Sequence, residues 1–168
     1  MNASGPLPLR LAAPAWRRIR ELAAAAWPHE ACGLLVGSSL TATRPVQAIA
    51  CRNLATDPEQ GYCIDPETFL HIEHAARARG GAVIGVWHSH PHGDPTPSER
   101  DRREAWPNWS YLIVGTDGAR VTPPRAWRLD GRQCREQQVA ILGPHAGARA
   151  AGLERRHREC YKRSLTTA

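Results

Sequence analysis

The sequence predicts a three-layer α/β domain in which one mixed β-sheet is flanked by helices. Short apolar runs rich in β-branched residues alternate with longer segments whose apolar residues recur at helical spacing. Such alternation is typical of domains that pack helices against a sheet. The length of 168 residues suits one compact domain, which would bury about two-thirds of its unfolded surface.

Helix and strand signals alternate through the first half of the chain. The apolar stripe of residues 14–26 predicts an amphipathic helix. Asp65 followed by Pro66 is a strong helix start, because aspartate caps free N–H groups and proline fits the first turn. Gly80-Gly81 is a strong stop. In chain order, the expected elements are a strand over 7–11, the helix over 14–26, strands over about 33–38 and 45–53, and a helix over 66–79.

The second half opens with an apolar run over residues 81–87 that is bounded by glycine and short enough for a buried strand. Pro91 ends that strand, because proline has no N–H for the ladder. Asp130-Gly131 is the best hairpin signal in the chain. The expected elements are the buried strand, a turn-rich loop over 92–97, a short helix over 98–105, a strand over 111–114, and hairpin strands over 125–129 and 132–140.

The composition changes after Gly143-Pro144, where alanine and arginine become frequent. We therefore expect one domain over residues 1–143 and an Arg-rich helix or partly ordered tail over residues 144–168.

The most informative stretch of the chain is His88-Ser89-His90, which directly follows the buried strand. Residues two apart on a strand project to the same face, so His88 and His90 aim both imidazoles at one point. Pairing these with a carboxylate would give a tetrahedral Zn²⁺ site that keeps one position for water, as catalytic zinc sites do. The sequence therefore predicts a hydrolytic zinc centre.

Ser98 and Asp101 lie three residues apart in the expected short helix, so their side chains share one face. Asp101 can then turn back toward the histidines as the third ligand. The same Ser-x-x-Asp spacing also fits a helix cap, with Ser98 as the N-cap and Asp101 in the first turn. Capping and ligation are compatible, and both readings stay open on the sequence alone.

These residues resemble the signature of the JAMM (MPN+) metallopeptidases. The shared pattern is His88-Ser89-His90-Pro91, seven residues between His90 and Ser98, and two between Ser98 and Asp101. Upstream, Glu30 in His29-Glu30-Ala31-Cys32-Gly33 matches the glutamate of that family. The resemblance covers roughly residues 7–140, and the nearest likeness is to compact, single-domain bacterial members. Further matching segments are Ile64-Asp65-Pro66 and Trp109-Ser110-Tyr111-Leu112-Ile113-Val114.

The resemblance implies a three-layer MPN (JAB) fold, cytidine-deaminase-like in build, with one bound Zn²⁺. It implies that His88, His90 and Asp101 are the zinc ligands and that Glu30 is the general base and acid. It also implies that Ser98 donates a hydrogen bond to the developing oxyanion. From the residues alone, Glu30 could equally be an ordinary solvated carboxylate, although it precedes an apolar run that should form a strand beside the histidines.

The function implied by the resemblance is zinc-dependent hydrolysis of a peptide or isopeptide bond after the C-terminal Gly-Gly of a ubiquitin-like or sulfur-carrier protein. The alternative is a non-catalytic MPN-fold module that recruits a ubiquitin-like partner. A nucleic-acid role through the basic tail is the weakest reading, because no binding motif or interleaved aromatic pattern accompanies the tail. The sequence does not decide whether the chain forms a homodimer.

The net charge of +6 favours anionic partners, which include an acidic patch on a small protein substrate. No apolar stretch is long enough for a membrane span, and no signal peptide is recognisable, so a cytoplasmic location is expected. The five cysteines form no Cys-x-x-Cys pair. We expect them to be reduced and buried rather than joined in disulfides.

Overall fold

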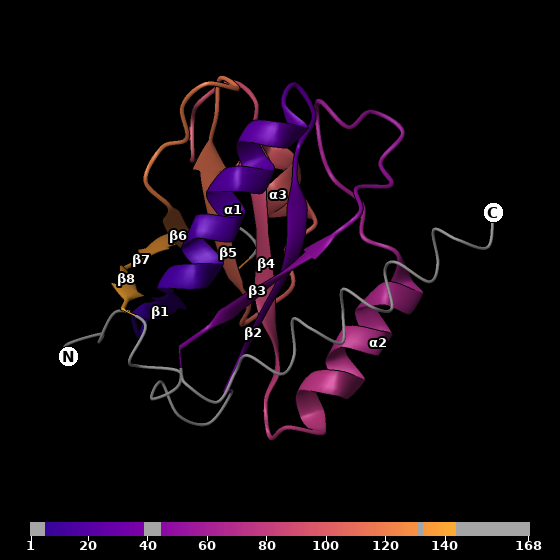
Figure 1. Ribbon diagram of the computed structural model, residues 1–168, viewed down its shortest axis with the longest axis vertical. Helices are drawn as coiled ribbons and strands as arrows, with labels where there is room; N and C mark the ends of the chain where they lie inside the picture. Colours follow the sequence, from indigo (N-terminus) through magenta and orange to yellow (C-terminus); the bar gives the residue numbers. More distant parts are fainter. Residues whose placement is uncertain (1–5, 39–44, 131–132, 144–168) are drawn as a thin grey trace.

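The computed structural model describes residues 6–38, 45–130 and 133–143. Its main sheet has six strands in the order β3-β2-β4-β5-β6-β7 (Figure 1). Only the β4–β5 pair is parallel, and the other pairs are antiparallel. The prediction of a mixed sheet is confirmed. The strands of this sheet are β2 (Cys32–Gly37), β3 (Gln47–Cys51), β4 (Ala82–His90), β5 (Ser110–Gly115), β6 (Arg125–Asp130) and β7 (Gln133–Gln137).

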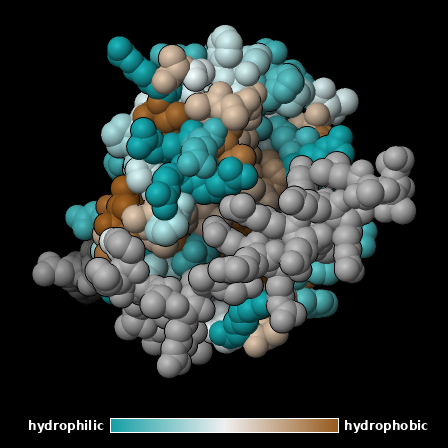
Figure 2. Space-filling view, viewed as in Figure 1, coloured by the Kyte–Doolittle hydropathy of each residue, from teal (hydrophilic) through white to brown (hydrophobic). Residues whose placement is uncertain are grey.

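Helix α1 (Ala13–Ala26) covers one face of the sheet and crosses in front of its strands in Figure 1. Its stripe of Ala15, Ile19 and Ala23 is buried against sheet residues such as Leu35 and Leu112. This is the amphipathic helix expected from residues 14–26. Its opposite side carries charged residues, and Figure 2 shows hydrophilic side chains over this part of the surface.

Helix α2 (Pro66–Arg77) packs on the other face, where Ile72 and Ala76 join a second apolar cluster with Val83 and Val86 of β4. The Asp65 carboxylate accepts a hydrogen bond from the Thr68 backbone N–H at 2.8 Å and thereby caps the helix. The predicted start of this helix is confirmed. The two helices and the sheet between them form the three layers.

One expected strand is two strands in the structure. Instead of one strand over 132–140, the chain forms β7 and then β8 (Val139–Leu142). β8 leaves the main sheet and pairs in parallel with the N-terminal strand β1 (Leu9–Ala12). Local pattern could not reveal this, because the partner of β8 lies about 130 residues away in sequence. The expected hairpin is present as the antiparallel β6–β7 pair, although Gly131 lies outside the described residues.

Two further predictions concern the cysteines and the C-terminal tail. Cys32 is buried and Cys51 half-buried, as expected, but Cys63 and Cys134 are exposed, so the prediction of burial is wrong for these two. All four are free thiols. The predicted tail over residues 144–168 lies outside the described part of the chain. Within the described ranges, no helix has the length and apolar character that a membrane crossing requires.

Candidate metal centre

The two histidines lie at the end of β4, a central strand with a hydrogen-bonded neighbour on each side. His88 stands opposite Cys32 of β2 and Ile113 of β5, so the backbone is held from both edges. Side chains alternate along the strand. Trp87 therefore enters the core beneath α1, whereas His88 and His90 project from the face that carries α2.

Asp101 reaches the histidines from α3 (Glu99–Arg103), the short helix that follows the loop after β4. Ser98 caps this helix: its Oγ accepts a hydrogen bond from the Asp101 N–H at 3.1 Å, while the Ser98 N–H donates to Asp101 Oδ2 at 2.7 Å. This reciprocal capping box fixes the first turn of α3. The fixed turn directs the Asp101 carboxylate toward β4.

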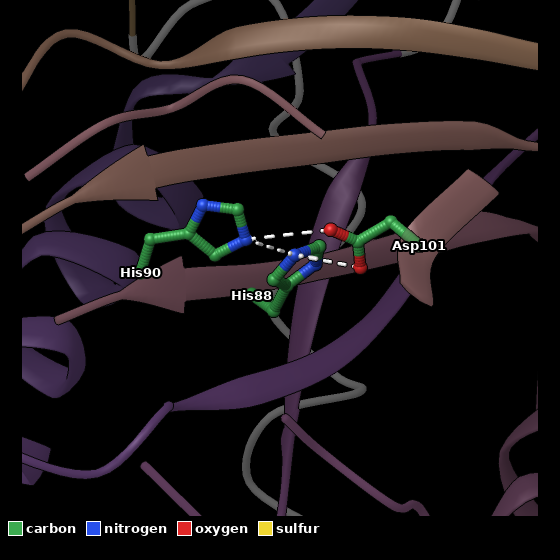
Figure 3. Close-up of side chains that lie close together, drawn as sticks. All are labelled: His88, His90 and Asp101. Carbon is green, nitrogen blue, oxygen red and sulfur yellow. Dashed lines mark hydrogen bonds and ion pairs between the residues drawn. The ribbon is translucent and has the colours of Figure 1, made fainter. Parts of the chain in front are cut away.

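The donor atoms of the three side chains converge on one small volume (Figure 3). His88 Nε2 lies 3.1 Å from His90 Nε2 and 3.3 Å from Asp101 Oδ1, and His90 Nε2 lies 3.4 Å from Asp101 Oδ2. His88 is fully buried and Asp101 is buried. Two imidazole nitrogens at this distance repel each other unless a proton or a cation lies between them. In the described part of the chain, these residues form the group that could hold a metal ion.

Burial and hydrogen bonding shift the charges of this group in different directions. Burial lowers the pKa of His88 and outweighs the nearby Asp101 carboxylate, so this imidazole is held neutral. Burial alone would raise the pKa of Asp101, but hydrogen bonds with His88 and His90 hold it well below its usual value. Burial alone would lower the pKa of His90, but its hydrogen bond with Asp101 and the charge of Glu30 raise it. The neutral His88 imidazole and the ionised Asp101 carboxylate are in the protonation states that metal ligation needs.

Glu30 enters the site because its backbone is tied to the end of β4. The neighbouring Ala31 N–H donates to Ser89 Oγ at 2.8 Å, and the Ser89 N–H donates to Ala31 O at 2.9 Å. The Asn53 side-chain amide donates to the Glu30 carbonyl at 3.0 Å. Ser89 points away from the face of the histidines, and this makes it a tether for the glutamate. The contacts between Ala31 and Ser89 join residues that lie 58 positions apart, and the Asn53 contact spans 23.

The Glu30 side chain is only 7% exposed, so it is not the solvated carboxylate that the sequence left open. Burial raises its pKa to about 8, an effect that the charges of His90 and Arg100 partly oppose and that of Asp101 reinforces. A carboxyl group with a pKa near neutrality can both accept and release a proton at physiological pH. Such a group suits general acid–base chemistry.

The hydroxyl group of Ser98 is committed to Asp101. Its hydrogen is donated to Asp101 Oδ2 at 2.6 Å, and a hydroxyl has one hydrogen to donate. Capping, one of the two roles that the sequence left open, is therefore present in the structure. Ser98 also lines the pocket described below, so its oxygen borders the same space as Glu30 and Asp101.

A pocket of about 310 Å³ opens beside the metal centre. Its lining combines Glu30, Ser98 and Asp101 with apolar residues, many of which are aromatic. The apolar lining residues are Leu34, Tyr62, Ile64, Pro66, Phe69, Val86, Trp106, Trp109 and Tyr111. The pocket thus joins ionisable groups to an apolar surface that can hold an apolar chain.

Aromatic rings contribute to the site in two places. The Tyr62 ring lies over the His88 ring, with centroids 4.7 Å apart, and helps to keep water from that imidazole. Phe69, Trp106 and Trp109 form one aromatic group, in which Phe69 and Trp109 stack at 5.9 Å. We had no local signal for Tyr62, because it lies in an irregular loop whose path only the fold defines.

Residues 12–130 match the family described as prokaryotic homologs of the JAB domain. The chain belongs to this family. The match contains the six site residues Glu30, His88, Ser89, His90, Ser98 and Asp101. The JAB-domain resemblance seen in the sequence is thereby confirmed.

Two curated relatives of this JAB-domain chain have names that state an activity. The desampylase of Haloferax volcanii is 41% identical over 127 residues, which cover 73% of this chain and 85% of the relative. The probable TtuB-protein conjugate cleaving protease of Thermus thermophilus is 36% identical over 95 residues, which cover 56% of this chain and 61% of the relative.

Solved structures agree with the fold. A protein from Desulfitobacterium hafniense superimposes with a TM-score of 0.69 at 28% identity, covering 79% of this chain and 92% of that one. A JAB1/MPN domain protein from Archaeoglobus fulgidus has a TM-score of 0.50 at 18% identity, covering 82% of this chain and all of that one. The predicted JAB fold is confirmed.

Proposed function

We propose that this chain is a zinc-dependent peptidase that cleaves the peptide or isopeptide bond after the C-terminal Gly-Gly of a ubiquitin-like or sulfur-carrier protein. The names of both curated relatives support the reaction class, since one is a desampylase and the other is named for cleaving protein conjugates. The convergence of His88, His90 and Asp101 is the observation that carries the proposal.

The spacing of the three donor atoms supports zinc as the metal. Ligands at about 2.0–2.1 Å from a tetrahedral Zn²⁺ lie roughly 3.3 Å from one another. The two imidazole nitrogens are 3.1 Å apart, His88 Nε2 is 3.3 Å from Asp101 Oδ1, and His90 Nε2 is 3.4 Å from the other carboxylate oxygen, Oδ2, all close to this value. A nitrogen, nitrogen and oxygen set is also one that zinc prefers. When bound, zinc lowers the pKa of water and polarises a substrate carbonyl.

Glu30 performs the proton transfers in this proposal. It takes a proton from the attacking water and later gives it to the amine that leaves, a role that contributes roughly 10²–10⁴-fold to the rate. Its raised pKa comes from burial, so the pocket itself prepares the group for this task. Ser98 stabilises the negative charge that develops on the carbonyl oxygen. For this it must redirect the hydrogen that it now donates to Asp101.

The aromatic side of the pocket provides a surface for the substrate chain. Trp106 is 58% exposed although it is a large apolar side chain. The turn that carries it is held in place, because the Trp106 N–H donates to the Tyr111 hydroxyl and Arg128 donates to the Asn108 carbonyl. A rigid, exposed aromatic surface beside Glu30 can bind the residues that precede the scissile bond with little loss of side-chain entropy.

The decisive experiment incubates zinc-loaded protein with ubiquitin-like proteins from the same genome, as extended precursors and as lysine conjugates, and follows intact mass. We expect loss of the segment after Gly-Gly. Glu30→Gln should keep zinc and the fold but lose nearly all cleavage, and His88→Ala should lose the metal. The matched controls are Glu21→Gln on α1 and His71→Ala on α2, both at exposed positions.

Full turnover by Glu30→Gln would contradict the assignment of the base. Wild-type protein that carries less than one metal ion per five chains after purification with zinc, and cleaves nothing, would contradict the peptidase proposal. That result would favour the non-catalytic binding module instead.

A further inference from the structure

The imidazole of His90 is oriented by the loop over residues 91–97, and this loop is in turn held by β6. His90 Nδ1 lies 2.7 Å from the carbonyl oxygen of Asp94. A carbonyl oxygen only accepts hydrogen bonds, so Nδ1 must carry the hydrogen. The neutral ring then has its free lone pair on Nε2, the atom that faces His88 and Asp101. The Asp94 carbonyl thus selects the tautomer of His90 that can bind a metal.

The loop reaches this position through contacts with the side chains of β6. The Trp127 indole N–H donates to the carbonyl oxygen of Pro95 at 3.0 Å, directly next to the Asp94 carbonyl. Arg125 Nη1 lies 3.4 Å from Thr96 Oγ1. Trp127 is 7% exposed and packs in the apolar cluster beneath α2. A buried indole is a firm anchor, because its ring has little freedom once packed.

Arg125 is itself held rigidly. Its guanidinium forms two hydrogen bonds with the Glu136 carboxylate of β7, at 2.8 and 2.9 Å. It also lies over the Trp127 ring, 4.4 Å from the centroid. Paired hydrogen bonds of this kind have one preferred geometry. The β6–β7 hairpin therefore presents a rigid surface to the loop.

The other side of the loop is tightly packed. The Thr116 N–H donates to the His90 carbonyl at 2.9 Å, and the Thr96 N–H donates to Asp94 Oδ1 at 3.0 Å. A Cβ added at Gly115 would overlap the carbonyl of Gly93. The loop is thus confined between β5 and β6. Loss of one anchor allows the Asp94 carbonyl to move away from His90.

We infer that Trp127 is a positioning residue for the metal centre. Through the Pro95–Asp94 backbone, Trp127 holds His90 in its metal-binding tautomer and orientation. This inference rests on the proposed role of His90 as a zinc ligand. Trp127 lies on β6, a strand that carries none of the three donor residues. His88 differs from His90, since its Nδ1 has no hydrogen-bond partner in the described structure.

The test replaces Trp127 by phenylalanine, which removes the indole N–H but keeps an aromatic ring in the core. Zinc affinity is measured by competition with a chelator, and we expect the dissociation constant to rise about tenfold, the lower end of what lost outer-shell contacts cost. In the zinc-free protein, ¹⁵N NMR of labelled histidine is recorded well above the usual imidazole pKa. The wild type should show the pure Nδ1–H tautomer for His90, and the W127F variant a mixture of tautomers.

The matched control is Trp16→Phe on α1, which should change neither measurement. Arg125→Gln, at a more accessible position, should change the zinc dissociation constant and the His90 tautomer ratio in the same direction, but by less. This variant replaces W127F as the test if W127F does not fold. A folded W127F protein with wild-type zinc affinity and a pure His90 tautomer would overturn the inference. A wild type that binds no zinc would instead refute the proposed function, while the tautomer measurement would still decide the role of Trp127.

Discussion

Glu30 shows how one buried residue couples charge to stability. It is nearly inaccessible to water, and burial raises its pKa to about 8 from the usual 4.5. The folded protein therefore holds the proton of this carboxyl group more tightly than the unfolded chain does. A group with a raised pKa stabilises the fold below its unfolded pKa, and this contribution is lost as the pH rises through the folded pKa.

We therefore predict that Glu30→Gln makes the metal-free protein relatively more stable as the pH rises from about 4.5 to 8. The wild type loses up to about 1.4 kcal/mol per pH unit in this window from Glu30, and the amide loses none. Urea unfolding of both proteins in the presence of chelator measures the difference. A difference in unfolding free energy that stays constant across the window would show that the carboxyl group is not desolvated in the folded state.

Ser98 has two roles that a substitution can separate. Ser98→Ala removes a helix cap, which should cost about 1 kcal/mol of stability. If Ser98 also donates to the oxyanion, kcat should fall by about 10²–10³-fold. Unfolding curves give the first quantity, and turnover of a conjugate by zinc-loaded protein gives the second. A drop in stability with unchanged kcat would restrict Ser98 to capping and to the orientation of Asp101.

At the scale of elements, the turn between α3 and β5 joins the core to the pocket. The indoles of Trp106 and Trp109 in this turn contact Phe69 of α2. Helix α2, which Asp65 caps, therefore also supports the proposed substrate surface. The two indoles and Phe69 lie outside β4 and α3, the elements that carry His88, His90 and Asp101. Substitutions in this aromatic group can therefore test the proposed substrate surface without removing a residue that could hold a metal.

We predict that Trp106→Ala lowers kcat/KM by about tenfold, mainly through KM, because the aromatic surface binds the substrate chain in both the ground state and the transition state. Zinc content should not change. Trp27→Ala is the matched control, since Trp27 is 49% exposed but lies outside the pocket lining. Steady-state kinetics on one conjugate compares the three proteins. An unchanged KM in Trp106→Ala would remove this surface from the proposed substrate path.

On the scale of the whole molecule, the metal centre links segments that would otherwise separate on unfolding. His88 and His90 belong to the central strand, Asp101 to a short helix, and Glu30 to the loop before β2. A ligand that binds only the folded state stabilises it in proportion to its affinity. A cation bound by these residues should therefore act on the stability of the entire domain.

Zinc removal is predicted to lower the thermal midpoint by roughly 5–10 °C, relative to protein with zinc at about 100 times its dissociation constant. Differential scanning calorimetry with and without chelator measures this shift. The His88→Ala variant should show no shift, whereas His71→Ala should behave as the wild type. A chelator effect of equal size in His88→Ala would mean that the metal acts elsewhere.

Much of the fold was visible in local patterns of the sequence. The stripe of Ile19 and Ala23 predicted α1, and the Asp65-Pro66 pair predicted the start of α2. These signals work because helix periodicity and capping depend on neighbouring residues. The β1–β8 pair was not predicted, because strand pairing between distant segments leaves no local signal.

The sequence by itself determined which donor groups the candidate metal site has. A His-x-His pair after a buried strand, followed by Ser-x-x-Asp, specifies donor types and a spacing that suit a metal, since side-chain direction follows from strand and helix periods. Only the tertiary structure decided that Glu30 is buried beside these donors and that Trp127 holds the loop of His90. Each of these facts depends on contacts between segments far apart in the chain, where packing, rather than local preference, decides which atoms meet.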